Sequence, residues 1–229
     1  MNAKALILLS GGLDSSTVLY QAKADGCDCY ALSFDYGQRH RRELDAAKTI
    51  ARRVGVVEHR LVSFDMAQWG GSSLTDTTMA LPEGRSLSAM ASEIPSTYVP
   101  ARNTIFLSFG LSYAEAIEAD WIYIGVNALD YSGYPDCRPD YTDAMQEVFR
   151  LGTKRGREGN PTTILKPLIH LKKTEIIEMG NRLGVPWEHT WSCYAGGEAA
   201  CGKCDSCLLR LKAFADLGLS DPLPYVTRG

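Results

Sequence analysis

A glycine-containing segment directly after an apolar run is the feature that most limits how this chain can fold. The apolar run covers residues 5–9, and residues 10–16 then read Ser-Gly-Gly-Leu-Asp-Ser-Ser before a helical pattern begins. The apolar run predicts a buried strand, and Ser and Asp are typical of the start of a helix. Glycines let the backbone approach an anion closely, and the free N–H groups of the next helix point toward it. The segment therefore predicts a strand–loop–helix unit that binds phosphate rather than a plain glycine turn.

This loop differs from the phosphate loop of kinase-type nucleotide-binding proteins, which ends in Gly-Lys-Ser/Thr with a lysine that reaches the terminal phosphates. Residues 10–16 contain Asp14 and hydroxyl residues but no lysine. A carboxylate beside a phosphate is favourable when Mg²⁺ lies between them, so we expect Asp14 to bind Mg²⁺ and the loop to hold the pyrophosphate part of ATP. Ser33 ends the second apolar strand, and its backbone can meet adenine or can be an ordinary strand position. The expected ATP contacts are Leu9, Ser10, Gly11, Gly12, Leu13, Asp14, Ser15, Ser16, Thr17, Val18, Leu19 and Ser33.

Length and charge limit the possible partners. The chain has 229 residues, a net charge of −3 and an isoelectric point near 5.8. A nucleic-acid surface is normally basic, so we expect no nucleic-acid partner. No stretch approaches about 18 consecutive apolar residues, and the first residues lack the apolar core of a signal peptide. We therefore expect a cytoplasmic protein with no membrane contact.

Strand and helix signals alternate along the chain. This alternation predicts an α/β fold with a doubly wound, mostly parallel sheet of five strands. We expect residues 1–185 to form the α/β domain, and residues 186–229 a small helical module packed on it as part of one continuous globular unit. The expected strands are residues 4–9, 29–34, 58–63, 121–124 and 163–165. The first expected helix follows the first strand and ends near residue 25, and the others cover residues 41–54, 104–119, 140–151, 172–183 and 205–217.

Two long stretches interrupt the alternation. Residues 66–97 are rich in Gly, Ser, Thr and Met, and such a connection is a lid, a binding loop, a disordered segment or a tolerated surface insertion. Residues 125–140 follow the end of a predicted strand, where ligands of such sheets bind, so we expect a functional loop there. Residues 104–119 are apolar on nearly every helical face, so this helix is either central or covered by a partner subunit. We expect a homodimer.

Four cysteines near the C-terminus predict a metal site. Cys193, Cys201, Cys204 and Cys207 are separated by seven, two and two residues, and nearby glycines can turn the backbone so that the thiolates converge on one Zn²⁺. A site with four sulfur ligands has no open position, so the zinc would be structural. An iron–sulfur cluster and a pair of reactive thiols are the alternatives. Cys27, Cys29 and Cys137 are expected to be packing residues, although Cys137 lies in the candidate loop.

Five stretches together resemble the 7-cyano-7-deazaguanine synthase family, ATP-dependent enzymes of queuosine precursor synthesis. The first stretch alone indicates only a PP-loop ATPase, whereas the fourth and the cysteine cluster are more specific. The chain departs from the family pattern at Leu13, where Gln is frequent, and at Ala101, where Gly is frequent; Ala101 requires that the turn avoid a positive φ. The stretches are residues 10–15, 34–40, 99–103, 125–139 and the cysteines of 193–207.

The resemblance implies an adenine nucleotide α-hydrolase-like fold and a C–N bond-forming ligase. In that reaction 7-carboxy-7-deazaguanine, ammonia and ATP give 7-cyano-7-deazaguanine through an activated carboxylate and an amide. The absence of a glutaminase domain implies free ammonium as the nitrogen source. The phosphate loop favours AMP as the nucleotide product, although the sequence does not decide between AMP and ADP. The alternatives are a PP-loop enzyme that modifies tRNA by thiolation and a nucleotide-binding regulator with a zinc knuckle.

Candidate catalytic residues combine the phosphate loop with two cations. Asp14 is expected to bind Mg²⁺, and Arg102, just before a helix, can hold a phosphate or the substrate carboxylate, or can form a structural ion pair. Lys173 is assigned from the resemblance, because related PP-loop enzymes have a lysine before a Thr-Glu pair near the phosphates. A solvated helix face is the alternative for this lysine.

The candidate substrate-binding residues follow the second and fourth strands. Arg39 can bind a phosphate bidentately or begin a solvated helix. An acidic residue of the 125–139 loop, Asp130 or Asp136, can accept hydrogen bonds from the N1–H and 2-amino groups of a guanine-like ring, and a tyrosine can stack on that ring. A well-packed turn is the alternative for this loop. The residues expected to bind the substrate are Tyr36, Gln38, Arg39, Asp130, Tyr131, Tyr134 and Asp136.

Overall fold

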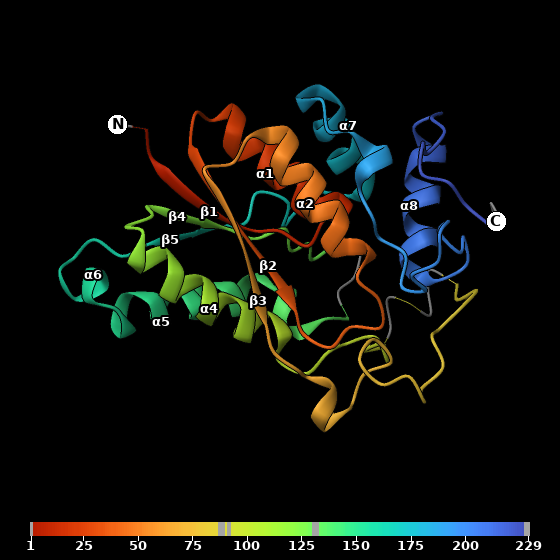
Figure 1. The fold of residues 1–229 in the computed structure, drawn as a ribbon, viewed down its shortest axis with the longest axis horizontal. Helices are drawn as coiled ribbons and strands as arrows, with labels where there is room; N and C mark the ends of the chain where they lie inside the picture. The colour runs from red at the N-terminus through yellow and green to blue at the C-terminus, as the bar shows by residue number, and fades with distance from the viewer. Residues whose placement is uncertain (1, 87–89, 91–92, 130–132, 227–229) are drawn as a thin grey trace.

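A parallel five-stranded sheet forms the centre of the protein (Figure 1). The computed structural model describes residues 2–86, 90, 93–129 and 133–226. The strand order is β3-β2-β1-β4-β5, and every neighbouring pair is parallel. The predicted α/β class and the five-stranded parallel sheet are confirmed. The strands are β1 (Lys4–Leu8), β2 (Asp28–Asp35), β3 (Glu58–Ser63), β4 (Trp121–Tyr123) and β5 (Thr163–Leu165).

Helices cover both faces of the sheet, as a doubly wound fold requires. In Figure 1, α1, α2 and α7 lie on one side of the sheet and α4 and α5 on the other. The predicted apolar helix over residues 104–119 begins two residues earlier and ends at Ala116. The helices are α1 (Leu13–Ala24), α2 (Arg42–Val54), α4 (Arg102–Ala116), α5 (Pro139–Gly152), α6 (Lys154–Arg157), α7 (Lys173–Leu183) and α8 (Asp205–Asp216), with short 3₁₀ turns η1 (Ala67–Trp69), η2 (Pro135–Cys137) and η3 (Trp187–His189).

Strand β1 shows why the sheet needs helices on both faces. Successive side chains of a strand point to opposite faces. Ala5 and Ile7 belong to the core under α1 and α7, whereas Leu6 and Leu8 belong to the core under α4 and α5. All four side chains are buried. The continuous apolar run of β1 therefore contributes side chains to the hydrophobic cores on both faces of the sheet.

The chain reverses its direction of travel across the sheet between β1 and β4. From β1 the chain proceeds through β2 to β3, and it then returns to β4 on the other side of β1 and continues to β5. Loops leaving the carboxyl ends of these two strands diverge to opposite faces and leave a crevice between them, which is where ligands of open α/β sheets bind. The glycine segment after β1 and the loop after β4 meet at this crevice.

The C-terminal segment packs directly on the α/β unit. Phe214 of α8 contacts Trp187 edge-to-face at 6.0 Å, and both side chains belong to the core that includes β1. Arg210 and Asp221 form a buried ion pair with N–O distances of 2.6 and 2.9 Å. The division of the chain at residue 185 remains a prediction, and the packing agrees with one continuous unit.

The long stretch at residues 66–97 connects the sheet to the cysteine segment. Glu83 pairs with Cys204 in an isolated antiparallel bridge, and its carboxylate accepts from Lys203 at 2.8 Å. Arg85 contacts the Asp205 carboxylate at 3.1 Å. The described part of this stretch is therefore tied to the start of α8 rather than being a plain surface insertion.

Ala101 corrects one expectation from the sequence. The residue has φ 54° and ψ 25°, in the left-handed region, so the prediction that this turn avoids positive φ is wrong. The left-handed conformation costs a residue with a Cβ about 1–2 kcal/mol. Glycine, which the resembling family often has at this position, would avoid that cost. The strained residue immediately precedes Arg102 and turns the chain into α4.

Within the described residues, no helix has both the length and the apolar composition needed to cross a membrane.

Candidate active site

A cavity of about 310 Å³ lies at the carboxyl ends of β1 and β4. Its walls come from the phosphate loop, β2, the first turns of α2, α4 and α7, the loop after β4, and the C-terminal segment. The cavity therefore lies at the crevice predicted by the sheet topology. Its lining residues are Leu8, Leu9, Ser10, Gly12, Leu13, Asp14, Ser15, Phe34, Tyr36, Glu43, Leu44, Arg102, Asn103, Phe106, Ile124, Gly125, Val126, Asn127, Tyr134, Cys137, Lys173, Trp191, Ser192, Tyr194, Ser206, Leu209 and Arg210.

The phosphate loop is held in shape by its own hydroxyl groups. Ser15 Oγ accepts from the backbone N–H of Ser10 at 3.2 Å and lies 3.0 Å from Ser10 Oγ. The backbone N–H of Gly12 donates to Ser10 Oγ at 3.3 Å. Of the predicted ATP contacts, the cavity is lined by Leu9, Ser10, Gly12, Leu13, Asp14 and Ser15, and not by Gly11, Ser16, Thr17, Val18, Leu19 or Ser33.

Gly11 serves the packing of the loop rather than the wall of the cavity. Its φ is 86°, and a Cβ at this position would lie 2.3 Å from the carbonyl oxygen of Glu43 and 2.5 Å from the nitrogen of Ala47. Only glycine allows this approach of α2 to the loop. The carbonyl oxygen of Gly11 accepts from the backbone N–H of Trp191 at 2.9 Å, so the loop also contacts the C-terminal segment.

Asp14 and Lys173 are paired in the cavity. Lys173 Nζ donates to both carboxylate oxygens of Asp14, at 2.9 and 3.0 Å. A carboxylate with neighbouring hydroxyls is a donor set that Mg²⁺ accepts, because this ion commonly uses one or two carboxylates together with substrate phosphates. The residues present therefore fit Mg²⁺ with ATP. The pair also places a positive charge beside the loop in which sequence reasoning found no lysine.

Arg102 projects into an aromatic part of the cavity. Its guanidinium donates to Tyr36 Oη at 3.5 Å and lies 5.9 Å from the Phe106 ring centroid. Phe106 stacks on Phe34 with a centroid distance of 4.0 Å. Burial raises the pKa of Tyr36 to about 12, so its hydroxyl stays protonated at neutral pH. This end of the cavity combines a cation with planar apolar walls, which suits a flat acid.

Glu43 is a cavity residue that sequence reasoning missed. It lies in the first turn of α2, is half-buried, and lines the cavity. Burial raises its pKa to about 7, while the charge of Arg102 opposes this shift. Gln38 Nε2 donates to Glu43 Oε1 at 3.1 Å. The sequence showed only an acid at the start of a basic amphipathic helix, where helix capping is a sufficient explanation.

Gln38 positions Glu43 rather than lining the cavity itself. Its Oε1 accepts from the backbone N–H of Tyr36 at 2.7 Å, and its Nε2 donates to the carbonyl oxygen of Phe34 at 3.1 Å as well as to Glu43. Three hydrogen bonds therefore fix this amide. The predicted direct contact of Gln38 with a substrate has no support in this geometry.

Arg39 is turned away from the cavity. Its guanidinium donates to the carbonyl oxygens of Ser73 at 2.5 Å and Asp76 at 2.7 Å, and also to that of Met79. These bonds hold the long stretch after β3 in place, and the predicted phosphate contact has no support in this geometry. Ser33 Oγ donates to the carbonyl oxygen of Leu9 at 2.5 Å and contacts His59, which is the ordinary strand role considered for Ser33.

The loop after β4 is partly structural. Asp136 is buried, does not line the cavity, and accepts from the backbone N–H of Asn103 at 3.0 Å. Its carboxylate therefore stabilises the N-terminus of α4, and the predicted contact with the guanine edge is not what the structure shows for it. Tyr134 lines the cavity, and its hydroxyl lies 2.7 Å from Thr97 Oγ1. The predicted residues Asp130 and Tyr131 lie outside the described residues.

Cys137 lines the cavity as a thiol. Asn103 Nδ2 donates to its sulfur at 3.3 Å. Burial raises the pKa of Cys137 to about 12, so the residue is not a thiolate at neutral pH. A nucleophilic role requires the thiolate, and this environment disfavours it.

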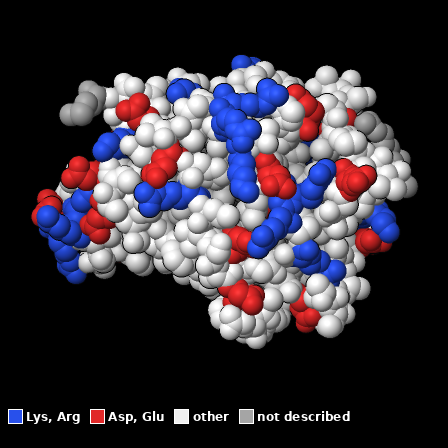
Figure 2. All heavy atoms as spheres, in the orientation of Figure 1, with Lys and Arg blue, Asp and Glu red and all other residues white. Residues whose placement is uncertain are grey.

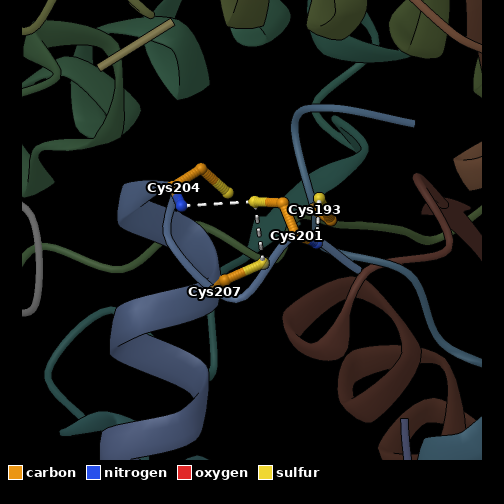
Figure 3. A group of neighbouring side chains, drawn as sticks. All are labelled: Cys193, Cys201, Cys204 and Cys207. Carbon is orange, nitrogen blue, oxygen red and sulfur yellow. Dashed lines mark hydrogen bonds between the residues drawn. The ribbon is translucent and has the colours of Figure 1, made fainter. Parts of the chain in front are cut away.

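The four predicted cysteines converge at the head of α8 (Figure 3). Their sulfurs all lie within 4.8 Å of one another, and those of Cys201 and Cys207 are 3.9 Å apart. Four sulfurs around one tetrahedral zinc, each at about 2.3 Å, would be about 3.8 Å apart, so the group fits a single ion. Hydrogen bonds from Cys204 and Cys207 lower the pKa of Cys193.

Backbone N–H groups point at the cysteine sulfurs. Those of Ala195 and Cys201 each donate to Cys193 at 3.3 Å, and that of Cys204 donates to Cys201 at 3.3 Å. Such bonds stabilise negative charge on sulfur, as metal-bound thiolates need. Ser192, which precedes Cys193, and Ser206, which lies between Cys204 and Cys207, both line the cavity. Order in the cysteine cluster is therefore coupled to the shape of the cavity wall.

Comparisons with known proteins agree with this geometry. A family model described as "Queuosine biosynthesis protein QueC" matches residues 4–218. The 7-cyano-7-deazaguanine synthase of a Nostoc species is 72% identical over 222 residues, which is 97% of each chain. That of Pseudomonas aeruginosa is 55% identical over 224 residues, 97% of this chain and 98% of the other. Among solved structures, NMN synthetase from Francisella tularensis aligns over 96% of this chain and 74% of that one, with 16% identity and a TM-score of 0.47, a similarity too weak to add to the functional assignment.

Proposed function

The chain belongs to the family of queuosine biosynthesis protein QueC, and from this membership we propose that it acts as a 7-cyano-7-deazaguanine synthase. At the level of residues, the proposal rests on one cavity that is lined by both phosphate-binding and aromatic side chains. The phosphate loop with the Asp14–Lys173 pair and Arg102 among aromatic rings line the same cavity. This arrangement suits a nucleoside triphosphate and a flat carboxylic acid bound side by side. It favours a ligase over a tRNA-thiolating enzyme.

The first chemical problem is that a carboxylate lacks a leaving group. We propose that the substrate carboxylate attacks the α-phosphorus of ATP, so that a C–O–P bond forms and the bond to pyrophosphate breaks. The phosphate loop and Lys173 offset the charge that develops on the departing pyrophosphate. Mg²⁺, held by Asp14 and the phosphates, would add Lewis-acid stabilisation of the same charge. Arg102 orients the acid for attack.

Ammonia then attacks the acyl adenylate, AMP leaves, and the amide forms. A second ATP activates the amide oxygen and releases pyrophosphate. Loss of both protons from nitrogen and departure of the oxygen with AMP then give the nitrile. The nucleotide product of each step is proposed to be AMP.

The cysteine cluster is proposed to hold one structural Zn²⁺. Four sulfur ligands leave no open position for a reactant. The ion would stabilise the fold of residues 193–207 and, through its neighbours Ser192 and Ser206, the cavity wall. Because binding and folding are linked at such sites, loss of metal should affect the cavity as well as stability.

A homodimer in the cytoplasm completes the proposal. Phe109 of α4 is 39% exposed although the helix is apolar, and it stacks with Phe64 at a centroid distance of 5.3 Å. A second subunit that covered this apolar face would remove it from water and stabilise the dimer.

On the face drawn in Figure 2, Lys and Arg side chains lie among Asp and Glu side chains, which fits a small-molecule enzyme better than a nucleic-acid surface.

The direct test is incubation of the protein with ATP, ammonium and a panel of carboxylated heterocycles, followed by mass analysis of all products. We expect the nitrile only from 7-carboxy-7-deazaguanine, together with AMP and pyrophosphate. ADP and phosphate as the nucleotide products would contradict the attack at the α-phosphorus. The absence of any nitrile would contradict the proposed function.

A further inference from the structure

We infer that Glu43 recognises the guanine-type edge of the substrate by accepting hydrogen bonds from its N1–H and 2-amino groups. The inference rests on the proposed function and assigns substrate specificity within the same cavity. The sequence predicted this role for Asp130 or Asp136 of the loop after β4; Asp136 is bonded to the N-terminus of α4, and Asp130 lies outside the described residues.

The acids available in the cavity are few. Within the described residues, Asp14 and Glu43 are the carboxylates that line it. Both oxygens of Asp14 accept from Lys173 beside the phosphate loop. Asp136 is buried outside the cavity and bonded to the N-terminus of α4. Glu43 is the remaining carboxylate; its backbone lies beside Gly11, and Gln38 links its side chain to the backbone of Phe34 and Tyr36.

The Glu43 carboxylate is held with one oxygen available. Gln38 donates to Oε1 at 3.1 Å and is itself fixed by the backbone of β2 and Tyr36. No hydrogen bond to Oε2 arises from the described part of the chain. Each carboxylate oxygen can accept two hydrogen bonds, so Glu43 can take two donors from one ligand edge while it keeps the bond from Gln38.

Glu43 and Arg102 carry opposite charges in one cavity without forming a direct ion pair within 4.0 Å among the described residues. Both residues are nevertheless connected to Tyr36. Arg102 donates to Tyr36 Oη, and Gln38 links Glu43 to the Tyr36 backbone. A cation and a separate carboxyl group that can accept hydrogen bonds favour a ligand that carries a carboxylate at one end and paired N–H donors at another. A carboxylated guanine-like ring has this pattern, and an adenine-like ring lacks the donor pair.

The planar rings of this region complete the match. Phe34 and Phe106 are stacked with an interplanar angle of 9°, and Tyr36 meets Phe106 edge-to-face at 5.4 Å. A flat heterocycle can lie against such a surface while its edges reach Arg102 and Glu43. The ribose hydroxyls of ATP are alternative hydrogen-bond donors to Glu43, and the experiment distinguishes them from the N–H donors of the substrate ring.

The test compares kcat/KM for 7-carboxy-7-deazaguanine with that for the same acid lacking the 2-amino group. We expect the wild-type protein to prefer the first by about 100-fold or more, because a site built for N–H donors rejects an analogue without them. In Glu43→Gln this ratio should fall at least about tenfold, mainly through a higher KM for the amino-bearing acid, while the KM for ATP stays unchanged. Glu43→Asp, which keeps the charge, should retain most of the ratio.

Asp45→Asn is the matched control, because Asp45 lies on the same helix with a side chain 71% exposed. It should leave both kinetic constants unchanged. An unchanged ratio in Glu43→Gln would overturn the inference, as would a higher KM for ATP alone, which would place Glu43 at the ribose. Wild-type protein that forms no nitrile from either acid would instead remove the proposed function on which the inference rests.

Discussion

Lys173 Nζ lies 2.9 and 3.0 Å from the two carboxylate oxygens of Asp14, although 159 positions separate these residues in the chain. The pair joins the first turn of α1 to the first turn of α7 and lies at the phosphate end of the cavity. A cation that the phosphate loop itself lacks is thus supplied from a distant helix.

Asp14→Ala should abolish most ATP turnover while leaving the fold intact. The change removes the proposed Mg²⁺ ligand and the partner that positions Lys173, and we expect a loss in kcat of about 100-fold or more. Steady-state release of pyrophosphate measures the effect, and circular dichroism checks the fold. Asp143→Ala is the control, because Asp143 pairs with Lys166 at the surface with a side chain 73% exposed. Wild-type turnover in Asp14→Ala would remove the proposed metal role.

Ala101→Gly should raise the free energy of unfolding by about 0.5–1 kcal/mol. Glycine relieves the left-handed strain at φ 54°, although it adds some entropy to the unfolded chain. Ala116→Gly, at the last helical position of α4, is the matched control and should lower stability, because its backbone is helical. Urea denaturation of both variants measures the two signs. A destabilised Ala101→Gly would show that the turn is not strained.

Cys204→Ser should lose the bound metal and lower stability. A three-sulfur site binds zinc more weakly, and the lost binding free energy is lost folding free energy. Elemental analysis of purified protein should show about one zinc per chain in the wild type and in the control Cys27→Ser, whose thiol lies outside the cluster. If Cys204→Ser kept a full equivalent of zinc with wild-type stability, the four-cysteine site would be refuted. Iron in place of zinc would favour the cluster alternative.

Glu43 should make the protein less stable as the pH rises from 5 to 8. Its pKa is about 7 in the folded protein against an ordinary value of 4.5, so the folded state binds more protons in this range. The stabilisation is complete below pH 4.5 and is lost as the pH rises through 7, with a total of about 3 kcal/mol. Urea denaturation at several pH values should show this component in the wild type and not in Glu43→Gln. Identical pH profiles would argue against a buried, proton-binding Glu43.

Phe109→Asp should convert a dimer to a monomer. The charge would face the apolar surface of α4 that we propose a second subunit covers, and burial of an unpaired carboxylate is costly. Light scattering at several protein concentrations measures the mass. Leu219→Asp is the control, because Leu219 is 44% exposed in the loop after α8. Light scattering that shows only a monomer for the wild-type protein would contradict the proposed homodimer.

Local sequence patterns were sufficient to predict the features that depend on backbone conformation. The apolar run of β1, the glycines after it and the spacing of the four cysteines each specify a short piece of geometry. The parallel sheet, the strand–loop–helix order and the convergence of the four cysteines are confirmed. The expectation that Lys173 lies near the phosphates came from the family resemblance, and its pairing with Asp14 is seen only in the structure, because no local pattern connects residues in different helices.

The roles of the polar side chains could be decided only by tertiary structure. Arg39 and Asp136 are as polar as the true lining residues, but their hydrogen-bond partners are backbone groups that come from distant segments. Glu43 resembled an ordinary helix-start acid until folding placed Gln38 and Arg102 around it. A sequence determines which groups a residue carries, whereas the packing of loops against one another determines whether those groups meet a ligand, a carbonyl or water.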